Sequence, residues 1–114
     1  MTMTRKTLFA RTVSLTGGAA VTLASVMLAN GWTSTDSWEG TQGFLKPASA
    51  TLYIGDDENV RDAAAAPLYQ GYPVASGVAQ ELSQFRDGAG LIDPNKIYLY
   101  SVGTQNLSIL FDAA

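Results

Sequence analysis

The segment Lys96–Phe111, which reads KIYLYSVGTQNLSILF, constrains the fold more than any other stretch of this chain. Its two halves are rich in aliphatic and aromatic residues. Between them lies Gly103–Asn106, a run of small and polar residues that favour turns. Apolar runs on either side of such a loop are typical of a β-hairpin. The sequence therefore predicts that the chain closes with two antiparallel strands paired to each other.

Alternation assigns the side chains of these two strands to faces, because successive residues of a strand point in opposite directions. One face of the first strand carries Ile97 and Leu99, and the other carries Tyr98, Tyr100 and Val102. The second strand divides in the same way, with Leu107, Ile109 and Phe111 on one face and Ser108 and Leu110 on the other. Neither face of the first strand is polar. We therefore expect the rest of the domain to cover one face and a neighbouring subunit to cover the other.

The composition also points to protein partners. At 114 residues the chain has the size of one domain. Only 15 % of its residues are charged, whereas about a quarter is typical of a soluble domain. A freely dissolved monomer normally carries more surface charge. We interpret the deficit as surface that is buried against other subunits, and we expect a homo-oligomer.

Several chemistries have no support in the sequence. The chain has no cysteine and no histidine, so it lacks disulfides, thiol chemistry and the commonest general base and zinc ligand. It contains no GxxxxGK[ST], GxGxxG, GxSxG or HExxH motif. The carboxylate pairs Asp36/Glu39 and Asp56/Asp57 are typical of solvated loops. We therefore predict a protein that is not an enzyme and has no metal or cofactor.

The distribution of charge argues against two further classes of partner. The net charge of −3 combines three basic residues and no acid in residues 1–35 with four bases and ten acids in the remainder. Three cations are too few for a nucleic-acid-binding arm, and the acidic remainder repels phosphate. No apolar run reaches the ~18 residues of a membrane-spanning helix. We expect neither a nucleic-acid nor a membrane partner.

The N-terminal thirty residues admit two interpretations. Arg5 and Lys6 precede an apolar stretch that ends in the small-residue site 29–31, which is the layout of a cleaved signal peptide. Against that layout, Arg11 lies inside the stretch and Gly17-Gly18 interrupts it. Export with cleavage of this segment therefore stays as an alternative.

The structural interpretation of the same residues is the one we adopt. Apolar alternation over 7–15, turn residues at 16–18 and a second β-rich run at 20–23 predict a strand, a turn and a strand. We divide the chain into an N-terminal strand-turn-strand arm, residues 1–22, and a β domain, residues 23–114, which together form one domain.

A short helix and a tryptophan-containing loop follow. Leu23, Val26, Met27 and Asn30 have helical spacing, and Gly31 provides a stop. Residues 32–43 are rich in Gly, Ser and Thr and are expected to form a loop. Its tryptophans, Trp32 and Trp38, could form a ligand platform, but tryptophans more often complete a core or anchor a subunit contact.

The middle of the chain contains further strand and turn signals. Residues 44–46 form a short strand that Pro47 stops, and residues 50–55 form a strand that an acidic loop follows. A loop with one helical turn is expected over 60–67 and a turn over 70–73. Residues 76–85 fit either a helix or an irregular strand, and residues 93–95 form a turn. The predicted fold is mainly β, a small antiparallel β-sandwich or barrel with one short helix and an extended N-terminal strand or arm.

The order of motifs over residues 50–111 resembles a protein family. The string runs ATLYIGDD, then PLYQGYPVASG, then DPNKIYLYSVGTQNLSILF. This order resembles small virion structural proteins of tailed bacteriophages, and RTVSLTGGAAVTLASVML resembles their opening strand-turn-strand. The matching residues are Leu52, Tyr53, Ile54, Gly55, Gly71, Pro73, Val74, Gly77, Asp93, Ile97, Tyr98, Ser101, Gly103, Thr104, Leu107, Ile109 and Leu110.

The resemblance implies a non-enzymatic capsid decoration or cement protein at the capsid surface, with the major capsid protein or another virion protein as its partner. Residues 32–43 and 78–90 depart from the pattern, so a head–tail or tail component stays as an alternative. The expected interface residues are Arg5, Leu8, Phe9, Trp32, Trp38, Tyr98 and Tyr100. A further alternative is an exported bacterial β-sandwich module that binds carbohydrate through Trp32, Trp38, Tyr69 and Tyr72.

Overall fold

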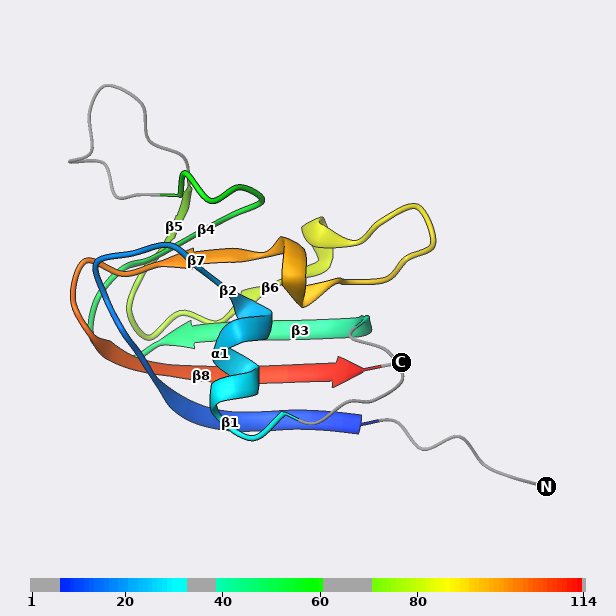
Figure 1. Ribbon diagram of the computed structural model, residues 1–114, viewed down its shortest axis with the longest axis horizontal. Helices are drawn as coiled ribbons and strands as arrows, with labels where there is room; N and C mark the ends of the chain where they lie inside the picture. The colour runs from blue at the N-terminus through cyan, green and yellow to red at the C-terminus, as the bar shows by residue number, and fades with distance from the viewer. Residues whose placement is uncertain (1–6, 33–38, 61–70, 114) are drawn as a thin grey trace.

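Two antiparallel sheets of four strands each pack face to face (Figure 1). The computed structural model describes residues 7–32, 39–60 and 71–113. One sheet, here the long sheet, has the order β1 (Thr7–Leu15), β8 (Gln105–Ala113), β3 (Gly40–Pro47) and β6 (Gln80–Glu81). The other, here the short sheet, has the order β2 (Val21–Thr22), β7 (Tyr98–Tyr100), β4 (Leu52–Gly55) and β5 (Tyr72–Val74). The prediction of a small antiparallel β-sandwich is confirmed.

Three short helical segments complete the described chain: α1 (Leu23–Ala29), η1 (Ser83–Phe85) and η2 (Pro94–Lys96). The helix predicted from residue 23 is confirmed as α1. Thr22 caps its first turn, since its hydroxyl accepts a hydrogen bond from the Ser25 N–H at 3.2 Å. Gly31 follows its end with φ of +96°, the left-handed conformation that terminates many helices.

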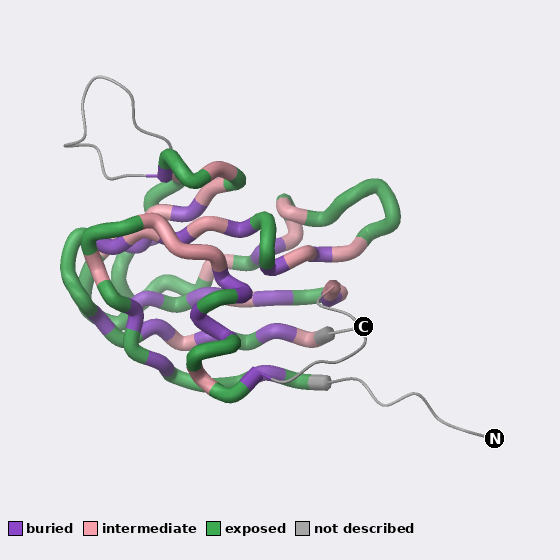
Figure 2. The backbone as a smooth tube through the Cα atoms, in the orientation of Figure 1, coloured by how far each residue is buried: buried purple, intermediate pink, exposed green. Residues whose placement is uncertain are grey.

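The core lies between the sheets and is closed by α1. Both sheets and the helix contribute side chains that are completely buried, among them Leu23, Met27, Leu45, Leu52, Leu99 and Phe111. Buried and exposed residues alternate along β8, as the tube in Figure 2 shows. The predicted inward face of the second closing strand, Leu107, Ile109 and Phe111, is confirmed. Ile97 and Leu99 are buried as one face, which confirms the division predicted for the first strand.

The predicted closing hairpin is wrong, although both of its strands exist. β7 pairs with β2 and β4 in the short sheet, whereas β8 pairs with β1 and β3 in the long sheet. Residues 101–104 therefore carry the chain from one sheet to the other. The physical reason is that β7 and β8 each have a buried apolar face. When β7 and β8 belong to two facing sheets, their apolar faces are buried against each other. Each strand is then part of a four-stranded sheet, which is more stable than a two-stranded hairpin.

The N-terminal strand-turn-strand has the same geometry. β1 pairs along its full length with β8, and β2 pairs with β7 in the other sheet. The first 22 residues thus contribute one strand to each sheet. Residues 16–20, 48–51 and 101–104 all cross between the sheets at one end of the sandwich (left in Figure 1).

These crossings pack against one another through their backbones. The Gly18 N–H donates to the Ser101 carbonyl at 2.8 Å, and the Ala48 N–H donates to the Asn106 carbonyl at 3.0 Å. A Cβ at Gly17 would overlap the backbone of Gly103, so only glycine permits this close approach.

The buried amide of Gln105 joins two of the crossings. Its Oε1 accepts hydrogen bonds from the Ser49 and Ala50 N–H groups at 3.2 and 3.0 Å. Its Nε2 donates to the Ser101 hydroxyl at 3.0 Å, and that hydroxyl donates to the Gly103 carbonyl at 2.6 Å. Gln105 is 6 % exposed and Ser101 is fully buried. Every polar group of this buried amide network therefore has a protein partner.

Three other local predictions are corrected. Part of the expected loop 32–43 is strand, because β3 begins at Gly40. Its Gly40 and Gly43 leave the space that the Phe111 ring occupies. The turn expected over 70–73 overlaps β5, which begins at Tyr72. Residues 76–85 form the short β6 and then η1, so the irregular strand is nearer the structure than the helix. The predicted helical turn at 63–66 lies outside the described residues.

We predict that Gln105→Leu destabilises the fold by about 1–3 kcal/mol, because the substitution removes the acceptor of two backbone N–H groups and the donor to the buried Ser101 hydroxyl. Urea unfolding monitored by circular dichroism measures this free energy. Asn106→Ala, at the next and exposed position, is the matched control and should change stability by less than about 0.5 kcal/mol. Equal effects of the two substitutions would contradict the role assigned to the Gln105 amide.

The loop after η1 is organised by the carboxylate of Asp87. Its Oδ1 accepts hydrogen bonds from the Ala89 N–H at 2.8 Å and from the Leu91 N–H at 3.1 Å. The N–H groups of Leu91 and Ala89, with a smaller effect of Lys96, hold the pKa of this carboxyl below its ordinary value of 3.8. The ionised form is therefore the one that stabilises the loop.

We predict that these hydrogen bonds contribute their full stabilisation above the ordinary pKa of Asp87 and lose it as the pH falls through the lower folded-state pKa. The carbon-13 chemical shift of the Asp87 carboxyl, followed by NMR against pH, should titrate with a midpoint below 3.8. The Ala89 amide should follow this titration, and Asp87→Asn should abolish it. A midpoint at or above the ordinary value would refute the prediction.

Candidate protein–protein interface

The outer face of the long sheet carries an apolar strip across three strands. Ala10 on β1 and Phe44 on β3 both lie opposite Leu110 on β8, which forms one cross-strand row. Leu8, one pleat further along β1, extends this row. Leu8 is 60 % exposed and Leu110 is 40 % exposed. We call Leu8, Ala10, Phe44 and Leu110 the apolar strip.

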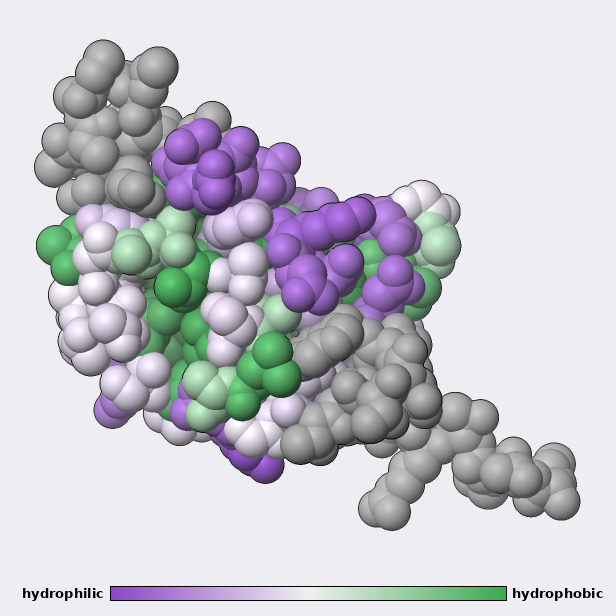
Figure 3. Space-filling model, in the orientation of Figure 1, coloured by the Kyte–Doolittle hydropathy of each residue, from purple (hydrophilic) through white to green (hydrophobic). Residues whose placement is uncertain are grey.

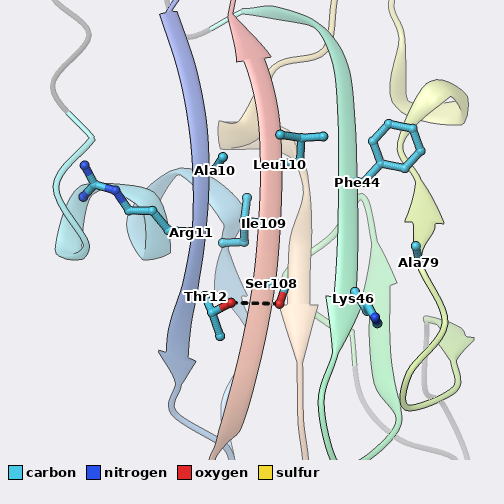
Figure 4. Close-up of a pocket in the computed structure, with 9 residues that line it drawn as sticks. All are labelled: Ala10, Arg11, Thr12, Phe44, Lys46, Ala79, Ser108, Ile109 and Leu110. Atoms are coloured by element: carbon cyan, nitrogen blue, oxygen red, sulfur yellow. Dashed lines mark hydrogen bonds between the residues drawn. The ribbon is translucent and has the colours of Figure 1, made fainter.

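A shallow hollow of about 580 Å³ adjoins the strip (Figure 4). It lies over β1, β8 and β3, and small side chains line much of it. The lining residues are Ala10, Arg11, Thr12, Phe44, Lys46, Ala79, Ser108, Ile109 and Leu110. Small residues between larger neighbours leave room for side chains of a second surface, because facing β-layers pack with interdigitated side chains.

The next cross-strand row is polar and borders the strip. Thr12 and Lys46 both lie opposite Ser108. The Thr12 and Ser108 hydroxyls are 3.0 Å apart and share a hydrogen bond, drawn as a dashed line in Figure 4. An apolar centre with a polar border is the usual arrangement of a protein–protein interface.

The free edge of β1 is less suited to binding a partner strand than the outer face of the long sheet is to binding a protein surface. β1 is a nine-residue edge strand, which would be long enough for another strand to pair with. However, Arg11 in its middle points away from the strip in Figure 4. Its guanidinium stacks over the Phe9 ring at 5.2 Å and donates a hydrogen bond to the Asn30 carbonyl. An inward-pointing charge in an edge strand is a common protection against strand pairing.

The outer face of the short sheet carries tyrosines. Tyr53 and Tyr100 lie opposite each other on β4 and β7, with ring centroids 6.5 Å apart. Tyr98, also on β7, lies beside them on the same face, and all three are half-buried. This face is where the sequence places a covering subunit, and that cover stays a prediction.

The predicted interface residues fall into three groups. Leu8 is exposed on the apolar strip, and Tyr98 and Tyr100 lie on the outer face of the short sheet. Phe9 and Trp32 are core residues, each 3 % exposed, so their proposed surface role is corrected. Arg5 and Trp38 lie outside the described residues.

The reason for the burial of Trp32 is an aromatic cluster at the end of α1. The Trp32 ring meets Phe9 edge-on with centroids 5.9 Å apart, and meets Phe111 edge-on at 6.1 Å. The backbone N–H of Trp32 donates to the Met27 carbonyl at 2.9 Å, which fixes the chain after the helix. Trp32 thus completes the core, which was the less specific of the two roles considered for it.

Leu110 and Phe44 are the two residues of the strip's central row that were not predicted from the sequence to lie at an interface. A signal for Leu110 exists, since it shares the otherwise polar face of β8 with Ser108. Phe44 gives no such signal, because a strand of residues 44–46 shows too little alternation to assign its side chains to faces, whereas the observed strand is Gly40–Pro47. Only the register of β3 on β8 brings Phe44 opposite Leu110.

The front face in Figure 3 differs in character from the strip. Strongly hydrophilic atoms gather over the loop that follows β4 and over the loops around η1 and η2. Less polar and apolar atoms cover the region of α1.

Among the described residues, no three carboxylate, cysteine or histidine side chains gather where they could hold a metal ion. A membrane-spanning helix is likewise not found in the part of the chain that the structure describes.

Comparison with protein-family models, with curated proteins and with solved structures finds no match to this chain. The geometry of the sandwich and its surfaces therefore carries the functional argument.

We predict that Leu110→Glu reduces self-association of the purified chain, because it places a charge at the centre of the apolar strip. Sedimentation velocity over a hundredfold range of concentration measures the change. Leu28→Glu is the matched control, since Leu28 is an apolar residue of α1 that is 56 % exposed and lies outside the strip. If both variants sediment like the unmodified chain at every concentration, the strip does not drive association.

Proposed function

We propose that this protein is a non-enzymatic virion structural protein of a tailed bacteriophage. Its role is that of a capsid decoration or cement protein, which binds the major capsid protein or another virion protein at the capsid surface and acts as a homo-oligomer. The observation that carries the proposal is the exposed apolar strip on the outer face of the long sheet. The strip is exposed in a chain of which only 15 % of the residues are charged. An exposed apolar surface on such a chain favours a role in binding other proteins.

The strip is suited to docking because it is held rigidly. β8, its central strand, is paired on both sides, with β1 along nine residue pairs and with β3 on the other side. Its inner face is locked by the fully buried Leu107 and Phe111. A surface that is already ordered loses little conformational entropy on binding. Repeated weak contacts of this kind suit a lattice of identical subunits.

Cementing follows from binding the assembled shell in preference to its separated subunits. A ligand that binds only one state stabilises that state, by about 2.7 kcal/mol per site when its free concentration is a hundred times its Kd. Hundreds of such sites on one shell add up, so a modest contact at the strip is enough to raise the temperature at which a capsid ruptures.

The resemblance to small virion structural proteins supports the same function. Its motifs fall on β4 and β5 of the short sheet, on β7, and on β8 of the long sheet. The matching residues are therefore spread over strands of both sheets and over the loops that join them.

Two features of the fold disfavour the alternative of an exported bacterial β-sandwich module with a cleaved signal peptide. A chain cleaved near Gly31 would lose β1, β2 and α1, and with them the buried residues Leu15, Leu23 and Met27. In the carbohydrate alternative, Trp32 packs on Phe111 of the long sheet while Tyr72 lies on β5 of the short sheet. These two rings therefore belong to separate places in the fold, which favours the virion proposal over this version of an exported module.

We predict that particles of the phage that encodes this protein rupture at a lower temperature after the protein has been stripped from them. Adding back the unmodified chain should restore the rupture temperature, whereas Leu110→Glu should not and the control Leu28→Glu should. Release of DNA, followed by dye fluorescence during heating, gives the readout. An unchanged rupture temperature on stripping would remove the cement role.

Copy number separates decoration from the remaining alternative. Quantitative mass spectrometry of purified particles should give hundreds of copies for a decoration protein. About a dozen or fewer would indicate a head–tail or tail component instead, and none would end the proposal that the protein is part of the virion.

A further inference from the structure

A second hollow lies on the side of the sandwich that is bordered by the edge strands β5 and β6. It has a volume of about 320 Å³ and is lined by Ile54, Tyr72, Gln80, Gln84 and Phe85. An adjoining hollow shares four of these residues and extends to Asp56, Arg86 and Lys96. We call the two together the edge cleft. It is formed by both sheets and by η1, and it is separate from the apolar strip.

Two aromatic side chains give the edge cleft apolar walls. Tyr72 is 63 % exposed, which is unusual for a ring that could have been buried in the sandwich. Phe85 is half-buried and packs against the core, so η1 holds it in place. Ile54, which is buried in the core, supplies an apolar floor.

Two amides supply the polar groups. Gln80 donates through Nε2 to the Glu81 carbonyl at 2.9 Å, which orients the amide and leaves its Oε1 as an acceptor. Gln84 is exposed and makes no hydrogen bond to another described residue, so its amide has both a donor and an acceptor to offer. The cleft therefore combines ring faces with uncharged groups that donate and accept.

The strands that border the cleft are poorly suited to binding an extended peptide through its backbone. β5 has three residues, and Pro73 in its middle has no N–H to donate. β6 has two residues. Recognition at this place must rely on side chains.

None of the described residues that line the hollow of about 320 Å³ is charged, which favours a neutral ligand, and the charged residues belong to the adjoining hollow. Arg86 is engaged, since its Nε and Nη2 both donate to the Thr41 carbonyl, at 3.2 and 2.8 Å. The two other charged residues, Asp56 and Lys96, have opposite signs and lie at the flank.

We propose that the edge cleft binds a neutral oligosaccharide. The C–H face of a sugar ring is apolar and would stack on Tyr72 and Phe85, while its hydroxyl groups would exchange hydrogen bonds with the amides of Gln80 and Gln84. Aromatic walls with a few convergent polar groups are the usual composition of a small-molecule site. This activity goes beyond the proposed capsid role and does not depend on it, because it uses different residues on a different side of the molecule.

The test is a titration of the full-length, nitrogen-15-labelled chain with maltotetraose, cellotetraose and tetra-N-acetylchitotetraose, followed by NMR. At least one of the three should shift the amide signals of Tyr72, Gln84 and Phe85. Tyr72→Ala should weaken that binding about tenfold, the loss expected for one aromatic contact of about 1.4 kcal/mol. Tyr72→Phe should retain it, and Tyr98→Ala, on the outer face of the short sheet, is the matched control and should leave it unchanged.

Three outcomes would overturn the assignment. The first is the absence of any shift at about 20 mM of every sugar. The second is a shift that Tyr72→Ala and Gln84→Ala both leave unaltered. The third is binding only to an acidic sugar such as tetragalacturonate, abolished by salt, since the cations and not the rings would then make the contact. Thermal unfolding of each variant establishes that it is folded. If Tyr72→Ala does not fold, the loss of sugar binding is measured with Gln84→Ala, a substitution at an exposed position.

Discussion

The amide of Gln105 is the interaction on which the two-sheet arrangement depends. It stands at the first residue of β8, where the chain has just crossed from the short sheet to the long one. By bonding to the backbone at Ser49 and Ala50 and to the Ser101 hydroxyl, it ties the crossing after β3 to the crossing before β8. A buried amide with fewer partners would carry a desolvation cost, so its full set of partners selects this one arrangement.

The same strand explains how core and surface are coupled. The inner face of β8 fills the space left by Gly40 and Gly43 with the Phe111 ring, and Trp32 packs on that ring from the end of α1. Its outer face holds Leu110 at the centre of the apolar strip. Because a one-residue change of register would exchange these two faces, the packing of the core also fixes the position of the proposed docking surface.

Much of the local structure could be predicted from the sequence. The short helix ending before Gly31, the strand containing Leu52 and Ile54, and the alternation of β8 all follow from period and turn chemistry, which act between near neighbours. The candidate sites were far less predictable. Leu8 was identified, but Phe44 lies opposite Leu110 only through the register of β3 on β8. Likewise, Tyr72 lines one hollow with Gln84 and Phe85 only because the fold brings β5 and η1 to the same side of the sandwich.

By itself, the sequence determined that this protein is a small, mainly antiparallel β domain whose strands have one strongly apolar face, because alternation and glycine positions are properties of short stretches. The tertiary structure alone decided which strands pair. Residues 103–106 are equally compatible with a tight hairpin and with a crossing between sheets. The choice depends on the buried Gln105 network and on the backbone approach of Gly17 to Gly103, which join residues far apart in the chain. For that reason the strands could be found from the sequence, whereas the sheets, the apolar strip and the edge cleft could not.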